Sequence, residues 1–442
     1  MSKRFVHNTL DVLPITNDAL GRARHQLQQA ALTGLRKVEN EIPRMPFKDK
    51  GIYTGVMGIV VTFIRCAVQH KALGMSTEDV QALLHKAKAL LDAAGPPNPS
   101  HIRSGRISPL DSSPGIAFVK ILYSLYAPGG SADSQDLAAL ERAVHVAKED
   151  DSETNEILYG RAGLLYALCE LRSLLMRSGV QPDQRLVQLT SNTTLKALCD
   201  CIIRDGMDGT NDDDDEPLWF VWHGKQYLGT MHGTAGILTV LLQCPENIIT
   251  PYKSRILTTV RHLASLISEN DGHLPSSLPA HHDARRLVQI CHGSPGYVLL
   301  ITTLKSTHPD WAQELGQLVD DTLKQATNAV WERGLLTKGL GLCHGITGNA
   351  WPWLLLEHVS PSSADDADSV FGRALAFLLE ATKAPPMSYS TIYDIADHPY
   401  SLFEGLAGAV CCWVEACAII SSRLGEDGGV VLGLPGIGGL KI

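Results

Sequence analysis

The feature that most constrains the fold of this chain is a short glycine pattern that recurs along it. Each copy has a small residue, two variable residues and a glycine, followed by an apolar run, and the seven copies end at Gly58, Gly115, Gly163, Gly236, Gly296, Gly348 and Gly408. The second copy has Ser112 where the others have their first glycine. Successive copies are roughly 50 to 70 residues apart, about the length of two helices and their loops. This periodicity predicts a repeat architecture.

Each repeat predicts one apolar and one amphipathic helix. Buried-helix sequences such as GIAFVKILYSLY and GLLYALCELRSLL follow the glycines. Amphipathic patterns lie between them, from Leu137 to Ala147 with Ser134 as N-cap, and from Trp311 to Val330. Stacked repeats hide the apolar helices behind the amphipathic ones. The sequence therefore predicts an all-α fold, a double-layered (α/α)7 toroid with its glycine motifs at helix starts on one end of the ring.

Two parts are expected along the chain. Residues 1–45 form an N-terminal helical extension, in which Asp18 to Ile42 reads as an amphipathic helix on the outside of the ring. Residues 46–442 form the barrel domain, and the 44% of hydrophobic residues suffices for its core. Asn211 to Pro217 reads as an acidic surface loop. The glycine-rich end, GEDGGVVLGLPGIGGLKI, is expected to be irregular.

Charge and hydropathy exclude several classes of partner. The formal net charge of −9 argues against nucleic acid, because phosphate binding needs a basic surface. No targeting segment is evident at the start, so we expect a cytoplasmic protein. The longest apolar stretch, Ala409 to Ile420, contains Glu415 and is expected to be too short for a membrane span. Peripheral association with a membrane stays open.

Two repeats carry metal-binding chemistry. The fifth begins Cys291-His292-Gly293 and the sixth Cys343-His344-Gly345. Equivalent positions in a ring of repeats point to the same mouth, and two thiolates with an imidazole suit zinc. The alternative is that these cysteines fill the core, as we expect for the other eight in a reducing compartment. Those eight are Cys66, Cys169, Cys199, Cys201, Cys244, Cys411, Cys412 and Cys417.

The motifs together resemble those of the LanC-like proteins, relatives of the bacterial lanthipeptide cyclases. YTGVMG, LLYGRAG, HGTAG, CHGSPG, LCHGITGNAW and SLFEGLAG occur in family order over about residues 46 to 425. The resemblance implies a seven-fold α,α-barrel and a Zn²⁺ ion held by Cys291, Cys343 and His344. It also implies a transferase-type conjugate addition of a thiol to a dehydroamino acid. In the eukaryotic relatives the thiol is glutathione, added to dehydroalanine or dehydrobutyrine in a peptide or protein.

The resemblance also implies roles for five further residues. His232 matches the histidine that protonates the enolate, and Glu156 aligns with an acid of the bacterial cyclases. Arg161 would offset substrate carboxylates. Lys338 matches a lysine that contacts glutathione, and Glu404 would orient a ligand or the substrate amine. Zinc would supply the nucleophile, because a free thiol has a pKa of about 8.5 and only its thiolate attacks. His292 is expected to lie next to the metal without binding it.

The sequence also departs from the family pattern. Relatives carry an arginine shortly before SLFEG, where this chain has TIYDIADHPY with Asp394 and Asp397. Relatives also have tryptophan beside the cysteine of the fifth repeat, which reads LVQICHG here. An alternative function is therefore a non-catalytic scaffold or signalling protein that binds zinc and glutathione. A carbohydrate-active α/α-barrel is a further alternative, but its paired acids are not evident.

Overall fold

Nearly all secondary structure in this computed structural model is helical. It describes residues 4–45, 49–127, 132–149, 154–178, 183–208, 216–279, 287–363 and 366–440. The α-helices are α1 Asn17–Glu41, α2 Val56–Val68, α3 His70–Leu73, α4 Thr77–Ala94, α5 Pro114–Tyr126, α6 Ser134–Glu149, α7 Arg161–Ser178, α8 Gln184–Leu189, α9 Asn192–Met207, α10 Thr234–Leu241, α11 Glu246–Ile249, α12 Lys253–Glu269, α13 Ser294–Thr307, α14 Pro309–Leu315, α15 Gln317–Arg333, α16 Ile346–Val359, α17 Val370–Ala381 and α18 Leu406–Arg423.

Short 3₁₀ turns and one small sheet complete the described secondary structure. The 3₁₀ turns are η1 Ile42–Arg44, η2 Pro99–His101 and η3 Thr250–Tyr252. Strands β1 Gln226–Tyr227 and β2 Ser277–Leu278 pair antiparallel, with Gln226 opposite Leu278. The predicted all-α class is therefore confirmed.

Every glycine motif leads into an apolar helix, as the sequence predicted. These helices are α2, α5, α7, α10, α13, α16 and α18. Every residue of α10, and all but the last two residues of α16, are buried. In five of the seven a glycine is the N-cap, namely Gly55, Gly233, Gly293, Gly345 and Gly405.

The final glycine of the motif is required by a close backbone approach. A Cβ atom on Gly236 would lie 1.7 Å from the carbonyl oxygen of Thr230, and one on Gly348 would lie 1.7 Å from that of Leu342. The same clash with the carbonyl six residues earlier occurs at the final glycines of three more repeats, Gly58, Gly163 and Gly408. The loop before each of these helices therefore folds back over its first turn, where only a glycine fits.

Hydrogen bonds hold these loops in one shared conformation. In the same five repeats an N–H at the helix start donates to the carbonyl seven residues earlier, as in Ala235 to Leu228 at 3.0 Å and Ile346 to Gly339 at 2.9 Å. The first N–H groups of a helix have no acceptor within the helix, and here carbonyl oxygens of the preceding loop accept their hydrogen bonds. The residues just before the first glycine consequently occupy equivalent places from one repeat to the next.

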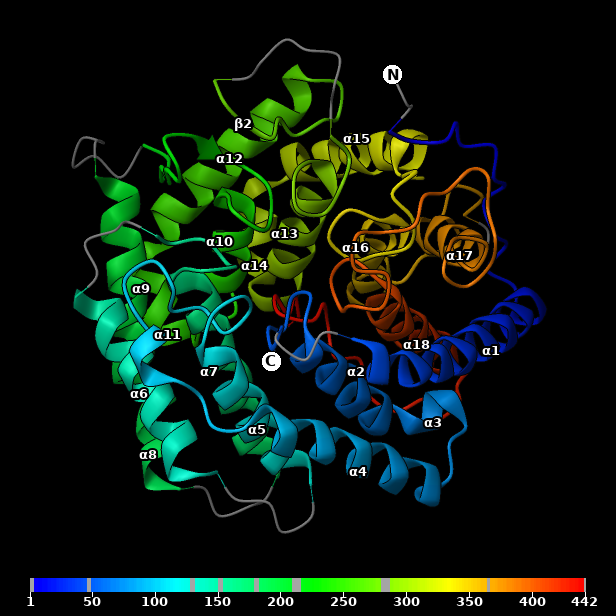
Figure 1. Cartoon of the computed structure of the whole chain (residues 1–442). Helices are drawn as coiled ribbons and strands as arrows, with labels where there is room; N and C mark the ends of the chain where they lie inside the picture. Colours follow the sequence, from blue (N-terminus) through cyan, green and yellow to red (C-terminus); the bar gives the residue numbers. More distant parts are fainter. Residues whose placement is uncertain are drawn as a thin grey trace. The chain divides into compact units, whose positions relative to one another are not determined.

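The described chain packs into two compact units. The first comprises Met1–Ala94, Val288–Ile290 and Thr327–Gly433, and the second Gly95–Leu287, Cys291–Ala326 and Leu434–Ile442. In the first unit α2 packs on α4, α16 on α17, and α18 on α1, α2 and α16 (Figure 1). The seventh repeat also adjoins the first through the N–H of Phe403, which donates to the Tyr53 carbonyl at 3.1 Å.

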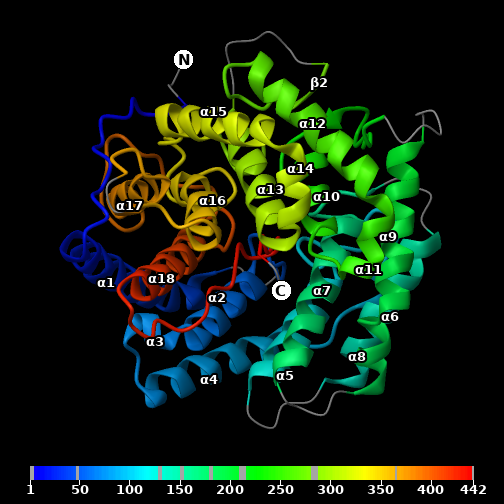
Figure 2. The ribbon, with the colours of Figure 1, turned by 180° about the vertical axis from the view of Figure 1, so that it is seen from behind.

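The second unit repeats the pairing of apolar with more polar helices. Here α5 packs on α6, α7 on α9, and α13 on α14 (Figure 2). The apolar helices also contact one another in chain order, α5 with α7, α7 with α10, and α10 with α13. Within each unit the structure therefore has the two helical layers that the repeat pattern predicted.

Helix α1 confirms the predicted amphipathic helix near the start of the chain. Thr16 is its N-cap and accepts a hydrogen bond from the N–H of Ala19 at 3.3 Å. One face, which includes Leu27, Leu35 and Val38, is buried. Because α1 packs on α18, it serves as the outer helix of the seventh pair. The domain boundary after residue 45 stays a prediction.

Four local expectations from the sequence have different outcomes in the structure. The helix expected from Trp311 to Val330 is divided into α14 and α15 at Gly316, whose φ of 56° lies in the left-handed region. Ser134 is the first residue of α6 and not its cap, because Asp133 Oδ1 accepts the N–H of Gln135 at 2.7 Å. The acidic loop from Asn211 lies outside the described residues up to residue 215. Residues 424–440 are irregular, as expected.

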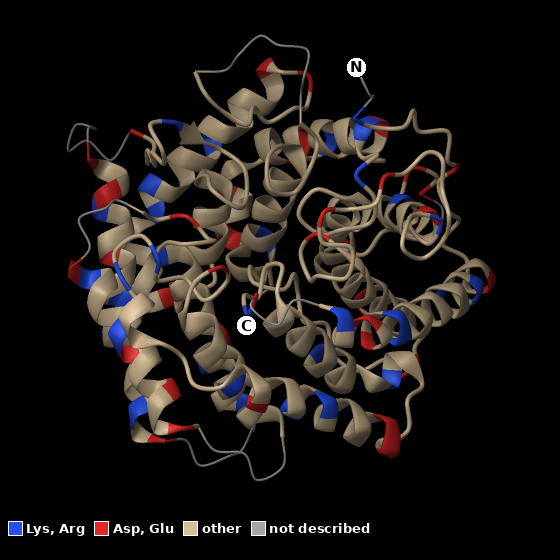
Figure 3. Ribbon diagram, viewed as in Figure 1, with Lys and Arg blue, Asp and Glu red and all other residues tan. Residues whose placement is uncertain are grey.

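Charge follows the two helical layers. Helices α4 and α6 carry acidic and basic residues on their exposed faces, whereas α2 has a single arginine (Figure 3). Helix α18 is the one described helix that is long and apolar enough to cross a membrane by length and composition. It is longer than the apolar stretch noted in the sequence, but 89% of it is buried in the structure. Packing on α1, α2 and α16 accounts for its apolar character.

Candidate metal and catalytic site

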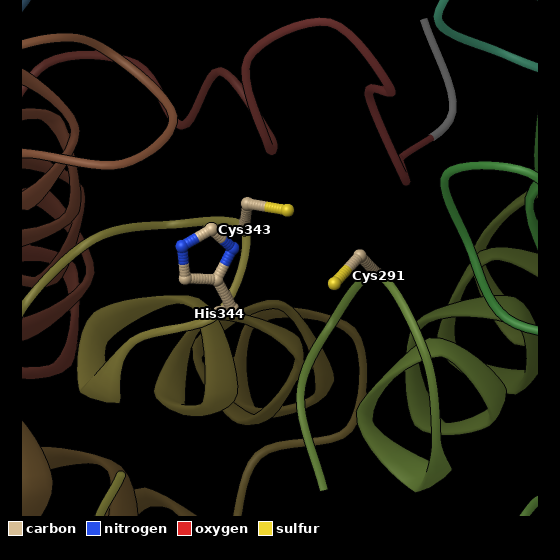
Figure 4. A group of neighbouring side chains, drawn as sticks. All are labelled: Cys291, Cys343 and His344. Atoms are coloured by element: carbon tan, nitrogen blue, oxygen red, sulfur yellow. The ribbon is translucent and has the colours of Figure 1, made fainter. Parts of the chain in front are cut away.

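The three predicted metal ligands come together in the structure. Cys343 and His344 lie in the loop before α16, and Cys291 lies in the loop before α13 (Figure 4). Their ligand atoms are all within 4.8 Å of one another. Both cysteines are buried, whereas His344 is partly exposed. Two sulfurs and one imidazole nitrogen form a donor set that zinc prefers, and a three-residue set leaves a fourth coordination position.

Backbone contacts fix both ligand loops. The N–H of Cys343 donates to the carbonyl of Phe403 at 2.7 Å. A Cβ on Gly229 would lie 2.2 Å from the carbonyl oxygen of Cys291, so a glycine there lets the fourth loop rest on this ligand. Gly293 follows the Cys291-His292 pair with a φ of 131°, a conformation that L side chains rarely adopt. These glycines therefore help to set the direction of the ligands.

Two opposing effects act on the imidazole of His344. Burial disfavours its charged form, but a hydrogen bond and the charge of Cys343 outweigh burial and raise the pKa of His344. The positive charge of Lys338 lowers the pKa and the negative charge of Glu404 raises it. Cys343 therefore favours the charged form of the His344 imidazole.

His232 and Glu156 form a hydrogen-bonded pair in the second unit. Nδ1 of His232 lies 2.8 Å from Oε2 of Glu156. The Glu156 side chain is 1% exposed and also accepts the N–H of Leu158 at 2.9 Å and that of Tyr159. A carboxylate held by its own loop orients the ring, so that Nε2 is directed away from Glu156. The imidazole keeps 17% of its surface exposed, so a substrate can reach it.

Aromatic rings surround His232. The indole of Trp222 stacks on the imidazole, with ring centroids 4.2 Å apart and planes 5° apart. The phenol of Tyr227 lies 6.1 Å from His232 and 5.5 Å from His292. The rings of His232 and His292 are 5.9 Å apart. The proposed proton donor is therefore next to the residue that follows the ligand Cys291.

A tight turn presents Trp222 to the histidine. Trp222 and Lys225 exchange two backbone hydrogen bonds of 2.9 and 3.1 Å, and His223 and Gly224 between them have φ values of 50° and 71°. Positive φ at both central residues is typical of a type I′ hairpin turn. The ring of Tyr159 also stacks near the indole, with centroids 6.2 Å apart, and the guanidinium of Arg106 lies over the Tyr159 ring at 4.0 Å.

Arg161 is placed differently from the substrate-facing role that the resemblance implied. Its side chain is fully buried and pairs with Asp205 at 2.6 Å. It also donates to Asn155 Oδ1 at 3.0 Å and to the carbonyl of Ala147 at 2.8 Å. These bonds join the third glycine loop to α6 and α9. The placement favours a structural role, and contact between Arg161 and substrate stays a prediction.

Lys338 and Glu404 lie in neighbouring loops of the first unit. A Cβ on Gly341, three residues after Lys338, would lie 2.4 Å from the carbonyl oxygen of Glu404. Lys338 is exposed. Oε2 of Glu404 lies 2.7 Å from Nδ1 of His398, a residue that the sequence reading did not single out. The loop with Asp394 also reaches this segment, because the N–H of Asp394 donates to the Thr337 carbonyl at 2.7 Å.

Trp222, Tyr227 and His398 contact the site residues but lie outside the glycine motifs, and they were not predicted from the sequence. Trp222 and Tyr227 lie in WFVWHGKQY, a stretch dense in aromatic residues that precedes the fourth motif. His223-Gly224, in the middle of this stretch, is a dipeptide typical of a turn. His398 gave no such signal, because a lone loop histidine is common.

Comparison with known proteins agrees with this arrangement. Residues 46–418 match the family model described as "Lanthionine synthetase C-like protein". "Glutathione S-transferase LANCL1" of Danio rerio is 30% identical over 263 residues, which are 58% of this chain and 57% of that protein. "LanC-like protein GCL1" of Arabidopsis thaliana is 27% identical over 391 residues, 86% of this chain and 81% of that protein. The chain therefore spans little more than half of the zebrafish relative.

Similarity to a solved structure supports the fold. "Nisin cyclase" superimposes with a TM-score of 0.56 at 15% identity, covering 89% of this chain and 95% of that one. At this identity the likeness concerns the fold alone, and it confirms the predicted helical toroid class. With the match over most of its length, the glycine-loop helices and the Cys-Cys-His group, this chain belongs to the LanC-like family.

Proposed function

We propose that this protein is a zinc-dependent enzyme that adds a thiol to a dehydroamino acid in a peptide or protein. Glutathione is the proposed thiol, and dehydroalanine or dehydrobutyrine the proposed acceptor. The single observation that carries the proposal is the convergence of Cys291, Cys343 and His344 within 4.8 Å. A relative named a glutathione S-transferase, 30% identical over 263 residues, supports the choice of thiol.

The ligand group fits zinc by its donor chemistry. Sulfur and nitrogen donors suit a borderline-soft cation, and both sulfurs are shielded from bulk water. Zinc, when bound at these residues, would lower the pKa of an incoming thiol and hold it as the nucleophilic thiolate. The exposed ammonium of Lys338 could pair with a carboxylate of the thiol substrate.

His232 is proposed to supply the proton that completes the addition. The sulfur forms a bond to the β-carbon, the carbon–carbon double bond breaks, and the α-carbon takes up one proton. No group leaves: the proton that the thiol loses on forming the thiolate restores the protonated form of His232, so the net reaction adds sulfur and one hydrogen across the double bond. Because Glu156 holds Nδ1, the opposite nitrogen, Nε2, is the one that can transfer a proton.

Mass spectrometry of a reaction mixture tests the proposal directly. The protein, with its metal content measured by elemental analysis, is incubated with glutathione and a dehydroalanine peptide. We expect one zinc per chain and adduct formation above the uncatalysed rate. Metal retained without adduct would favour the zinc-binding scaffold instead.

Two variants separate the ligand role from the proton-donor role. Cys343→Ala is expected to lose both zinc and activity, whereas His232→Ala is expected to keep zinc and lose activity. Cys201→Ser, a change at a buried cysteine of α9, is the matched control and should retain both. Stoichiometric zinc in Cys343→Ala would refute the ligand assignment, and normal turnover in His232→Ala would refute the proton donor.

A further inference from the structure

A loop of the first unit, between α17 and α18, exposes a cluster of apolar side chains (orange in Figure 1). In residues 389–397, here called the apolar loop, the side chains of Tyr389, Ile392 and Ile395 are 89%, 56% and 68% exposed. Elsewhere in the described chain, no seven consecutive residues hold more than one exposed large hydrophobic side chain. Single exposed apolar residues are ordinary, whereas a cluster marks a surface that binds another molecule.

Hydrogen bonds hold the backbone of the apolar loop in place. Tyr393 is buried beneath it, and its hydroxyl donates to Oε1 of Glu380 in α17 at 3.1 Å. Oγ of Ser390 accepts the N–H groups of Ile392 and Tyr393, each at 3.0 Å. Just before the loop, Lys37 of α1 donates to two backbone carbonyls at 2.7 and 3.2 Å. The three apolar side chains are therefore exposed by an anchored loop, and not by a loose one.

The apolar loop adjoins the loop that carries two of the candidate metal ligands in the same unit. The N–H of Asp394 donates to the carbonyl of Thr337 at 2.7 Å, and a Cβ on Gly339 would lie 3.0 Å from the carbonyl oxygen of Asp394. Gly339 belongs to the sixth glycine loop, because its carbonyl accepts the first N–H of α16 at 2.9 Å. Cys343 and His344 lie in that loop. A molecule bound on the apolar loop would therefore lie beside the metal ligands.

Acidic groups give this surface a second recognition feature. Asp394 and Asp397 are exposed within the apolar loop, and the partly exposed Glu404 follows in the seventh glycine loop. The basic groups near them are Lys338, which the proposed thiol would occupy, and His398, which pairs with Glu404 at 2.7 Å. The surface therefore complements a ligand that has both an apolar and a cationic side chain. Anionic lipid headgroups would be repelled by the two aspartates, which disfavours a membrane.

We propose that the apolar loop binds the acceptor polypeptide and selects an apolar side chain and a lysine or arginine near the dehydroamino acid. The inference rests on the proposed function, in which a dehydroamino acid of a peptide or protein is the thiol acceptor. Tyr389, Ile392 and Ile395 would cover the apolar side chain, while Asp394 and Asp397 would pair with the cation. The loop would thus set which polypeptide sequences are modified without contributing to the chemistry.

Fluorescence anisotropy of a labelled peptide tests binding without any reaction. The peptide has alanine in place of dehydroalanine, with leucine and arginine beside it, and the full-length protein is titrated into it. Ile392→Ser/Ile395→Ser and Asp394→Asn/Asp397→Asn should each weaken binding at least fivefold. Val187→Ser, at an exposed apolar residue of α8, is the matched control and should bind as the wild type does. Thermal unfolding verifies that each variant is folded.

Two binding results would overturn the proposal. One is equal affinity of the wild type for this peptide and for one with glutamate in place of arginine, together with unchanged binding by both double variants. The other is binding to vesicles of phosphatidylcholine and phosphatidylserine in place of the peptide, since the loop would then dock a membrane.

Kinetics with the dehydroalanine form of the peptide separate docking from chemistry. The double variants should raise KM for the peptide at least fivefold and leave kcat and KM for glutathione unchanged, the signature of lost binding alone. An acceptor as small as N-acetyl-dehydroalanine methyl ester, which lacks the flanking residues, should react equally with variants and wild type. Peptide binding without any adduct would refute the proposed function but not the docking surface, so the two failures are distinguishable.

Discussion

The indole of Trp222 lies flat on the imidazole of His232, with centroids 4.2 Å apart and planes 5° apart. Glu156 holds Nδ1 of the same ring at 2.8 Å. Glu156 fixes the direction of the imidazole within its plane, and Trp222 fixes the tilt of that plane. The proposed proton donor is consequently oriented before substrate arrives, which lowers the cost of reaching the productive geometry.

Removal of the stacking partner should slow proton transfer. Aromatic pairs contribute about 0.5–1.5 kcal/mol beyond burial, so Trp222→Ala is expected to reduce kcat by roughly two- to tenfold. Trp222→Phe should restore most of the rate. Trp219→Ala, in the same segment but beside His262, is the matched control. Steady-state kinetics with glutathione and a dehydroalanine peptide measure the effect, and an unchanged kcat would remove Trp222 from the site.

Glu156→Gln tests the carboxylate that orients His232. Glutamine has the same size as glutamate, but only one of its two terminal atoms is an acceptor oxygen. It cannot accept hydrogen bonds from both the loop N–H groups and Nδ1 of His232 as the two carboxylate oxygens do. We expect kcat to fall by about tenfold or more, with KM and zinc content unchanged, because the loss lies in the proton-transfer step. A parallel rise in KM with constant kcat would indicate a role in binding instead.

The glycine loops predict opposite outcomes for two Gly→Ala changes. Gly236→Ala places a Cβ 1.7 Å from the Thr230 carbonyl oxygen, so the free energy of unfolding should fall by about 2 kcal/mol or more. Gly21 in α1 has no atom within 4 Å of such a Cβ. Gly21→Ala should therefore raise the free energy of unfolding by about 0.5–1 kcal/mol. Urea unfolding compares the two, and equal effects would refute the loop explanation.

Asp136 makes the stability of the fold depend on pH. Burial raises the pKa of this carboxyl to about 6, although Lys120 opposes the shift. The folded state therefore holds its proton more tightly than the unfolded state, and this contribution is lost as pH rises from about 4 to about 6. Asp136→Asn should be more stable than wild type by about 1 kcal/mol at pH 7.5, after allowance for solvent screening.

Urea unfolding at two pH values checks this prediction. Near pH 3, below the pKa of about 3.9 in the unfolded state, the aspartic acid is largely neutral in both states, so the variant and the wild type should have similar stability. The difference should grow toward pH 7.5. A stability difference that is constant across this range would mean that the carboxyl does not titrate with the raised pKa.

Prediction from sequence succeeded where the signal was local and repeated. Apolar runs after seven glycines marked seven helices, and Cys291 and Cys343 stood out because the same Cys-His-Gly triplet occurs twice. Local signals failed where neighbours were equivalent: Asp133 and Ser134 can both cap a helix, and only the backbone geometry selects Asp133. Gly316 likewise could have lain within a helix, but the structure breaks the helix there.

The sequence by itself determined the helical repeat and the residue types available for metal chemistry, because both depend on spacing and on donor atoms. Tertiary structure alone decided which side chains act together. Glu156 and His232 are 76 residues apart, and they meet because successive glycine loops share one backbone shape and bond to one another, as in the 3.1 Å bond from Ile157 to Met231. Arg161 shares the same motif, yet its pairing with Asp205 directs it into the core. Contacts between distant segments set these directions, and a linear pattern does not contain them.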